Sequence, residues 1–502
     1  MPSSKLRRIP PPLVALGIFL LIGIGFAISY FVSQKPGPAP LEYSLETTFL
    51  TGPVEADGRI DYEWHRNRVS MGDIEPRDNA MTLIVRAIGP KPEGKRLHAD
   101  WWSLLGCEEP PEEGDYFKVR SQEAMSPAER ERFADASHFG QLRELRMQDQ
   151  VRLSSAPWKR ADEPEWAAWL ASIEKPLALV AEASSKPIYF HPIISRLESG
   201  ERGMMYAALL PYMQKIRVFA EPLCMRAMLH AGEGRFDDAW RDLHALDRLG
   251  ALIQRNPCCL VEGLVGLALQ DAAMTAMARL AHALPPNVEE TKAILAKIEL
   301  ASASWDWGIL VGVGERFNLL DSAFAMKIHP GNIEGWFPDF GRAVAQAKSD
   351  RLDWNAVFGT INREVDAIVA DLSKPRGPGS PAAWKYDASR FDEPDADLLA
   401  EDFRAGSEHF GKVLVNHFQK GFDNILRAEQ RSKQRRAFLA IALELTRHRA
   451  ANGEYPESLA KLGKPESGAI YERTELGYRL RSKGKKGIDD LGKNDDAVIS
   501  VP

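Results

Sequence analysis

The sequence predicts a mainly α-helical protein with an N-terminal transmembrane helix and a small C-terminal β-meander. Two long regions, residues 161–372 and 395–452, carry apolar residues at spacings of three and four, which is typical of packed helices. Residues 13–32 form an uncharged apolar run, and residues 453–502 contain three short apolar segments between Gly- and Asp-rich turns. These observations favour a helical bundle or array that stands on a single membrane anchor.

The same changes in pattern divide the chain into regions. They are a cytoplasmic tip and transmembrane anchor (1–34), a Pro-rich spacer with an irregular N-terminal region (35–160), a helical core (161–372), a linker or loop (373–394), a long helical region (395–452) and the β-meander (453–502). A chain of 502 residues is long enough for two or three domains with sizeable cores.

The N-terminal apolar run is long enough to span a membrane. Residues 13–32 contain no charge, and a helix of that length matches a bilayer core of about 30 Å. Basic residues lie mainly before the run: Lys5, Arg7 and Arg8 precede it, and Lys35 alone follows closely. By the positive-inside rule, the N-terminus stays in the cytoplasm and the bulk of the chain is periplasmic or otherwise extracytoplasmic. We therefore expect a single-pass protein of the inner (cytoplasmic) membrane.

A cleaved signal peptide is the competing interpretation of this run. Ala27, Ile28 and Ser29 would then form the small-residue cleavage site. The apolar run continues beyond that site through residues 30–32, which favours an uncleaved signal-anchor.

Charge and cysteine content exclude two classes of protein. The net charge of −6 becomes −10 for the rest of the chain once the four basic residues beside the apolar run are set aside. An acidic body argues against nucleic acid as a partner. Four cysteines in so long a chain exclude a disulfide scaffold. Cys224 could still pair with Cys258 or Cys259, and the alternative is that all three are small core residues.

Residues 260–281 form the most distinctive predicted helix, because they are apolar on every side. Asp271 near the middle would cost about 2.5–3.5 kcal/mol in lipid, so we expect a buried core helix and not a second membrane span. Helical spacing or helix caps predict further helices at residues 79–88, 101–105, from Ser126-Pro127 onward, 164–184, 235–255, 286–300, 317–328 and 361–372.

Some of these segments carry a second prediction. Residues 79–88 fit a buried strand as well, but capping by Asp78 or Asn79 and termination by Gly89-Pro90 favour a helix. Pro176 is expected to kink the helix at 164–184. Gly312-Val313-Gly314 indicates a helix break, and residues 330–340 indicate a loop rich in Gly, Pro and aromatic residues.

Residues 231–246 (AGEGRFDDAWRDLHAL) resemble the inter-helix turn of a tetratricopeptide repeat. Gly234, Phe236 and Ala239 stand where that repeat has a turn glycine, a packing aromatic and a small residue. The chain has no convincing second copy one repeat away, so the resemblance implies one helical hairpin and no solenoid.

Residues 442–462 (ALELTRHRAANGEYPESLAKL) are similar to the helix end and first turn of type II secretion pseudopilins, with Gly453, Tyr455, Pro456 and Leu459 carrying the match. Asn452-Gly453 is expected to end the helix, because both residues tolerate positive φ. Short segments between Gly- and Asp-rich turns predict a β-meander with strands at 469–473, 477–481 and 497–501. The resemblance implies the same order of a helix followed by a small sheet. It does not imply assembly into a pilus, because the N-terminus has no prepilin cleavage motif.

The anchor, the EGRFDDAWRDLHALDRLGALI stretch and the NGEYPESL tail together resemble a recurrent group of large planctomycete-type membrane-anchored proteins. This resemblance implies location and architecture. It implies no catalytic activity or mechanism.

The sequence contains no motif that identifies a reaction. Because it lacks Cys-x-x-Cys, His-Glu-x-x-His, Gly-x-Ser-x-Gly and a phosphate loop, we assign no catalytic, cofactor-binding or metal-binding residue. Single histidines (His65, His98, His138, His191 and His230) and the pair Trp305 and Trp307 fit surface or core positions.

The acidic stretch Asp489–Asp496 could bind calcium, with a solvated turn as the default. The basic run Arg427–Arg436 fits a solvated helix face better than contact with lipid headgroups.

We therefore expect a membrane-anchored envelope protein that binds or scaffolds a protein or peptide partner through its helical ectodomain, without catalysis. One alternative is a hydrolase-like enzyme whose site is dispersed in the sequence, and another is a pseudopilus- or secretion-associated component. A binding protein should show an extended groove and no cluster of buried ionisable groups. An enzyme should bring together carboxylates or histidines of perturbed pKa.

Overall fold

The computed structural model shows a mainly helical protein with one small antiparallel sheet, as the sequence predicts. The residues that it describes are 39–92, 94, 96–120, 149–196, 202–205, 208, 211–256, 259–284, 305–329, 331–338, 352–374, 394–419, 422–463, 469–482 and 498–501. The expected anchor, the helices at 126 and 286–300, the linker after Lys374 and the acidic stretch Asp489–Asp496 lie outside these residues.

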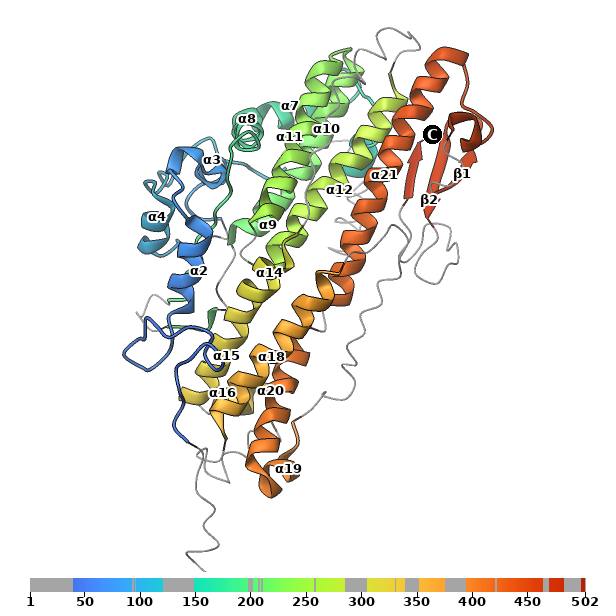
Figure 1. Cartoon of the computed structure of the whole chain (residues 1–502). Helices are drawn as coiled ribbons and strands as arrows, with labels where there is room; N and C mark the ends of the chain where they lie inside the picture. Colours follow the sequence, from blue (N-terminus) through green and yellow to red (C-terminus); the bar gives the residue numbers. More distant parts are fainter. Residues whose placement is uncertain are drawn as a thin grey trace, which may run out of the picture.

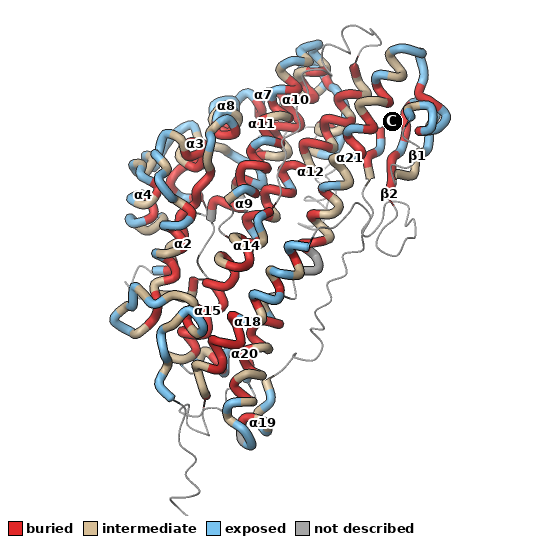
Figure 2. Tube along the Cα trace, viewed as in Figure 1, coloured by how far each residue is buried: buried red, intermediate tan, exposed pale blue. Residues whose placement is uncertain are grey.

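The helical body is elongated (Figure 1). One half contains α10 (Ala220–Gly232), α11 (Phe236–Arg255), α12 (Leu260–His282) and α21 (Phe422–Asn452). The other half contains α14 (Trp307–Ile309), η4 (Leu310–Glu315), α15 (Arg316–Ile328), α16 (Gly331–Trp336), α18 (Trp354–Leu372), α19 (Ala396–Glu401) and α20 (Phe403–Gln419). Each half has its own apolar core, and α12 contributes side chains to both. Figure 2 shows buried residues along the helices of both halves.

A smaller N-terminal lobe packs on one flank of this body (Figure 1). It contains α2 (Tyr62–Met71), η1 (Pro76–Asp78), α3 (Ala80–Ile88) and α4 (Ala99–Leu105), and α7 (Pro164–Ser172), α8 (Glu174–Ala183) and α9 (Pro211–Val218) connect it to α10. The prediction of a helix at α3 is confirmed. The Asn79 side chain accepts from the Met81 N–H at 3.0 Å, and Gly89 ends the helix with φ 93°.

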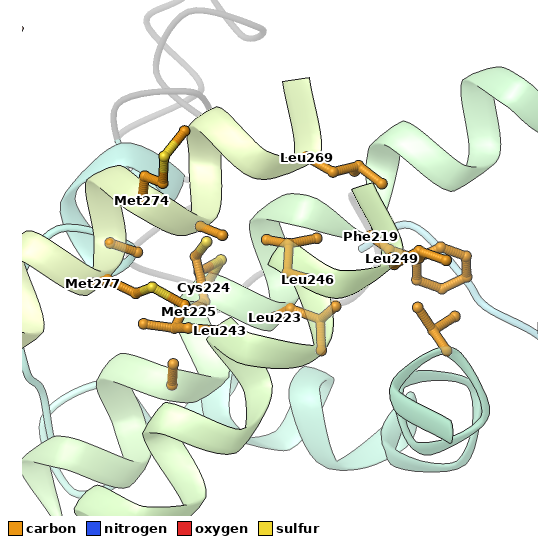
Figure 3. Close-up of a cluster of buried hydrophobic side chains, with 14 of the residues drawn as sticks. Phe219, Leu223, Cys224, Met225, Leu243, Leu246, Leu249, Leu269, Met274 and Met277 are labelled. Atoms are coloured by element: carbon orange, nitrogen blue, oxygen red, sulfur yellow. The ribbon is translucent and has the colours of Figure 1, made fainter. Parts of the chain in front are cut away.

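The helix α12 is a core helix, as its sequence indicates. It lies between α11 and α21, and Leu269, Met274 and Met277 are fully buried (Figure 3). Among the described residues, it is the one helix long and apolar enough to cross a membrane, and 67% of its most apolar window is buried inside the protein. Asp271 makes an ion pair with Arg435 of α21, so this half-buried carboxylate has a compensating charge within the body.

Glycines allow α11 and α12 to approach closely. A Cβ at Gly250 would lie 2.5 Å from the Gly266 oxygen, and a Cβ at Gly266 would lie 2.7 Å from the Gly250 oxygen. Beside this crossing, Gln254 donates to the Gln270 Oε1 at 2.7 Å, and Gln270 donates to Asp247 Oδ1 at 2.8 Å. The close approach brings these polar side chains within hydrogen-bond distance of one another in a buried position.

Pro176 has a larger effect than the predicted kink. The segment 164–184 forms two helices, α7 and α8, which meet at the non-helical residue Ile173. Because the proline ring clashes with the carbonyl four residues earlier, at Ser172, the first helix ends there and Pro176 falls in the first turn of the second.

The prediction of a break at Gly312-Val313-Gly314 was wrong. Residues Leu310–Glu315 form a π-helical turn inside a continuous helix, so the backbone hydrogen bonds run on through a wider turn. Likewise, residues 331–336 of the predicted loop form the short helix α16, because Ile333 and Phe337 are buried against the core. The helix α18 begins at Trp354, well before the predicted residue 361, because Asp353 caps it.

The predicted C-terminal β-meander and the predicted helix end at Gly453 are confirmed. Gly453 follows α21 with φ 82°, and η7 (Leu459–Leu462) leads to the antiparallel strands β1 (Ala469–Arg473), β2 (Tyr478–Ser482) and β3 (Val498–Val501), in the order β1-β2-β3. Strand β3 contacts α12 and α21, so the sheet packs on the body (Figure 1).

The α11–α12 crossing generates the first testable prediction. Gly250→Ala should lower the free energy of unfolding by about 1–3 kcal/mol, although alanine favours helices, because its methyl group meets the backbone of α12. Gly335→Ala in α16, where a Cβ would meet nothing within 4 Å, is the matched control and should not destabilise. Urea unfolding followed by circular dichroism measures both, and equal stability of the two variants would contradict the close crossing.

Candidate functional site

An extended segment, residues 188–196, runs between the N-terminal lobe and the helical body, and residues 189–193 are buried. Two asparagines hold its backbone. Asn79 accepts from the Phe190 N–H and donates to the Phe190 oxygen, both at 3.0 Å. Asn67 of α2 accepts from the Ile193 N–H at 2.9 Å and donates to the Ile193 oxygen at 2.7 Å. We call this arrangement the asparagine clasp.

Other side chains complete the bonding of this segment. The Trp101 indole donates to the Pro192 oxygen at 2.9 Å, and Asn256 at the end of α11 donates to the Tyr189 oxygen at 3.1 Å. Glu63 Oε2 accepts from the Ser195 N–H at 2.7 Å and from the Ser195 hydroxyl. Because a buried irregular backbone cannot bond to water, these side chains replace the hydrogen bonds that a helix or sheet would supply.

A cluster of charged side chains lies at the C-terminal end of this segment. Arg202, whose side chain is 7% exposed, makes ion pairs with Glu55, with Asp61 at 3.6 Å and with Asp321 of α15 at 3.4 Å. Asp321 also accepts from the Met205 N–H at 2.7 Å. We call Arg202, Glu55, Asp61, Glu63 and Asp321 the Arg202 cluster, and it joins the N-terminal lobe to α15.

Burial dominates the electrostatics of the Arg202 cluster. It raises the pKa of Glu63, Asp321 and Glu55, against the lowering effect of Arg202 and of the hydrogen bonds to Glu63 and Asp321. Burial would lower the pKa of Arg202, but the surrounding carboxylates raise it overall. Within these five residues one guanidinium faces four carboxyl groups, and the neighbouring Arg59 also lowers the pKa of Asp321.

A second polar group lies at the other end of the segment. The Tyr189 hydroxyl donates to Glu262 Oε1 of α12 at 2.6 Å, and Glu262 is fully buried. His191 is also buried, and neither ring nitrogen has a hydrogen-bond partner among the described residues. Burial lowers the pKa of His191 more than the charge of Glu262 raises it, so the imidazole is neutral.

The π-helical turn positions a further buried carboxylate. Glu315 Oε1 accepts from the Leu260 N–H at 2.8 Å, at the N-terminus of α12, where the preceding residue Cys259 supplies no side-chain cap. Burial raises the pKa of Glu315, while this hydrogen bond lowers it. Glu315 thus replaces the missing cap of the central helix.

Charged groups elsewhere also connect helices in pairs. Arg226 of α10 donates twice to Asp242 of α11, at 2.8 and 2.6 Å, and once to Glu174 at 3.0 Å. Arg436 of α21 pairs with the buried Asp247 at 3.3 Å. The assignment of the whole basic run to a solvated face was therefore wrong for Arg435 and Arg436, because these arginines reach the carboxylates of α11 and α12.

The C-terminal turn is held by a histidine. The Tyr455 hydroxyl lies 2.7 Å from His282 Nδ1, the two rings stack with centroids 5.9 Å apart, and Arg449 lies over the Tyr455 ring. Burial and then Arg449 lower the pKa of His282 to about 4, and burial raises that of Tyr455 to about 12. Arg449 also lies 3.4 Å from His282 Nδ1 and can only donate, so the neutral imidazole accepts a hydrogen bond from the Tyr455 hydroxyl at this nitrogen.

The residues considered in the sequence lie apart from one another. Cys224 carries a free, fully buried thiol in the core, so it is not joined to Cys259 (Figure 3). Cys258 and His138 lie outside the described residues. Trp305 and Trp307 pack edge to face, with centroids 5.0 Å apart, and the described residues contain no group of three potential metal ligands.

The buried ionisable groups were not predicted. A binding protein is expected to lack such groups. Yet burial raises the pKa of Glu63 and Asp321 and lowers that of His191, and all three lie in or beside the segment 188–205. The contacts of Glu63 and Asp321 indicate an architectural role, because their bonded oxygens accept from the backbone, from Arg202 or from Ser195.

Comparison with known protein families, with curated proteins and with solved structures found no match.

The Arg202 cluster predicts a pH effect of definite sign. A carboxylate whose pKa is raised on folding stabilises the protein most below its unfolded pKa, and this contribution is lost as pH rises through the folded pKa. The free energy of unfolding of the wild type, minus that of Glu63→Gln, should therefore increase as pH falls from about 7 to about 4.5. Glu112→Gln is the control, because Lys91 lowers the pKa of Glu112 and the difference should run the other way.

The His282 contact predicts the opposite dependence. The pKa of His282 is about 6.5 in the unfolded chain and about 4 in the folded protein. Its contribution to the free energy of unfolding is therefore fully present above about pH 6.5 and is lost as pH falls toward about 4. Thermal unfolding of the wild type should show this loss, and His282→Gln should show a smaller one. An unchanged pH dependence in the variant would contradict burial of a neutral imidazole.

Proposed function

We propose that this chain is a membrane-anchored envelope protein whose helical body acts outside the cytoplasm as a binding or scaffolding module for a protein or peptide partner. The apolar run at residues 13–32 and the basic residues before it support the location. The body that follows is an elongated set of packed helices, a shape suited to presenting a long surface (Figure 1).

The observation that carries this proposal is the fixation of the first described residues. Asn355 of α18 accepts from the Glu42 N–H at 2.8 Å and donates to the Pro40 oxygen at 2.9 Å. Two turns further along the same helix, Asn362 donates to the Glu46 oxygen at 3.1 Å and to the Thr47 oxygen at 2.6 Å. We call these contacts the tether clamp, because they attach the chain that follows the anchor directly to the body.

The tether clamp has an aromatic partner. Phe49 packs against Phe317 of α15 and lies under the Arg316 guanidinium, 4.1 Å from the ring centroid. A segment held by two asparagines and a cation–π contact transmits the position of the anchor to the helices. Such fixation suits a protein that must present its surface at a set distance from the membrane.

An enzyme is the second candidate, favoured by the raised pKa values of Glu63 and Asp321 beside Arg202. The two proposals differ in what Glu63→Gln would do. A scaffold should keep its partner when this variant is folded, whereas a catalytic carboxylate replaced by an amide should abolish turnover.

Protease accessibility tests the location and the anchoring together. In spheroplasts, added protease should digest the body of the full chain, and the chain should remain in the membrane after alkaline carbonate extraction. A body that resists protease until the cells are lysed would place it in the cytoplasm and overturn the proposal. Release into the carbonate supernatant would show that residues 13–32 are not an anchor.

Cross-linking of the full chain in intact membranes tests the binding role. The wild type and Glu63→Gln should give the same stoichiometric cross-linked complex, which a cytoplasmic control protein should not give. The absence of any such complex, together with a reaction that Glu63→Gln abolishes, would establish the enzyme in place of the scaffold.

A further inference from the structure

The exposed apolar side chains of this protein are unevenly distributed. Ten large apolar side chains are exposed in the part of the chain that the structure describes, and four of them lie within residues 43–64. These are Tyr43, Leu45, Val54 and Trp64, which are 38%, 72%, 48% and 45% exposed. We call them the tether-side surface. Single exposed apolar residues are ordinary, but a concentration of them indicates a contact.

The backbone holds this surface together. The Tyr43 hydroxyl donates to the Gly58 oxygen at 2.6 Å, which attaches it to the loop that contains Val54. Val54 forms an antiparallel β-bridge with Ile60. The side chain of the following residue, Asp61, accepts from the Trp64 N–H at 2.9 Å. Leu45 lies in the turn between Ser44 and Thr47, beside the tether clamp. The surface is therefore part of the fixed end of the body where the described chain begins (Figure 1).

The length of the spacer places this end near the membrane. Residues 33–38 alone separate the apolar run from the first described residue, and an extended chain of that length reaches at most about 25 Å. The tether clamp begins at Pro40, so the chain from that residue onward adds no further length to the spacer. Because the tether-side surface shares this end of the body with the tether clamp, the short spacer keeps it near the bilayer surface.

We propose that the tether-side surface lies on the lipid headgroup layer beside the anchor, so that the body is docked on the membrane. This inference rests on the anchoring proposed above. Tryptophan and tyrosine favour the membrane interface, and Arg68 lies over the Trp64 ring at 5.3 Å, where it can reach a lipid phosphate. The exposed carboxylates Glu42 and Glu46 commit the surface to zwitterionic lipid, because anionic headgroups would repel them.

The chain contains its own control for a labelling experiment. Leu476, in the turn between β1 and β2, is 75% exposed, which matches the 72% of Leu45. Likewise Val151 is 54% exposed and matches Val54. In water, the members of each pair should react about equally with hydroxyl radicals, because the residue type is the same and the exposed fractions are similar.

The test is radical footprinting of the full chain in nanodiscs of phosphatidylcholine. Leu45 should be labelled about threefold less than Leu476, because a side chain at the headgroup boundary loses its contact with water. Trp64 should become more reactive in the Leu45→Glu variant while Leu476 does not change. Replacing part of the lipid by phosphatidylglycerol should raise the labelling of Leu45.

The possible outcomes separate this inference from the proposed function. Equal labelling of Leu45 and Leu476 in a chain that stays in the nanodisc would overturn the docking and leave the anchor in place. A chain that does not enter nanodiscs would overturn the anchor and the docking with it. Labelling that is low on both leucines would also contradict the inference, because lipid contact would not be specific to the tether side.

Discussion

The structure depends on bonding the backbone of one buried, irregular segment. Residues 189–193 pass between the N-terminal lobe and the helical body, where neither water nor a neighbouring strand is available to their peptide groups. Each buried peptide group without a partner would cost about 1–3 kcal/mol. Asn67 and Asn79 remove this cost by offering a donor and an acceptor to one residue each. The asparagine clasp thereby fixes the lobe on the body.

The buried charges serve the same purpose over longer distances. Arg202 joins the lobe to α15, Arg226 joins α10 to α11, and Arg436 joins α21 to α11. A buried ion pair adds little net stability compared with an apolar contact, but removing one partner is strongly destabilising. These pairs therefore select one arrangement of the helices, and the apolar cores supply the stability.

The sequence predicts local features well and distant contacts poorly. The capped helix that ends at Gly89, the turn at Gly453 and the core position of α12 follow from neighbouring residues, and all are confirmed. In contrast, the partners in the Arg202–Asp321 pair are 119 residues apart, and each looks like an ordinary surface charge in the sequence. The helix break at Ile173 was predictable from Pro176, because the clash lies four residues earlier. The π-helical turn was not, since two glycines fit a break equally well.

Native-state hydrogen exchange at Phe190 and Ile193 tests the asparagine clasp most directly. These amides donate to side chains and belong to no helix or strand, so an ordinary loop would exchange them rapidly. The account predicts that they exchange as slowly as amides of α12, and that Asn67→Ala accelerates Ile193 more than it accelerates α12. Rapid exchange of both amides in the wild type would contradict it.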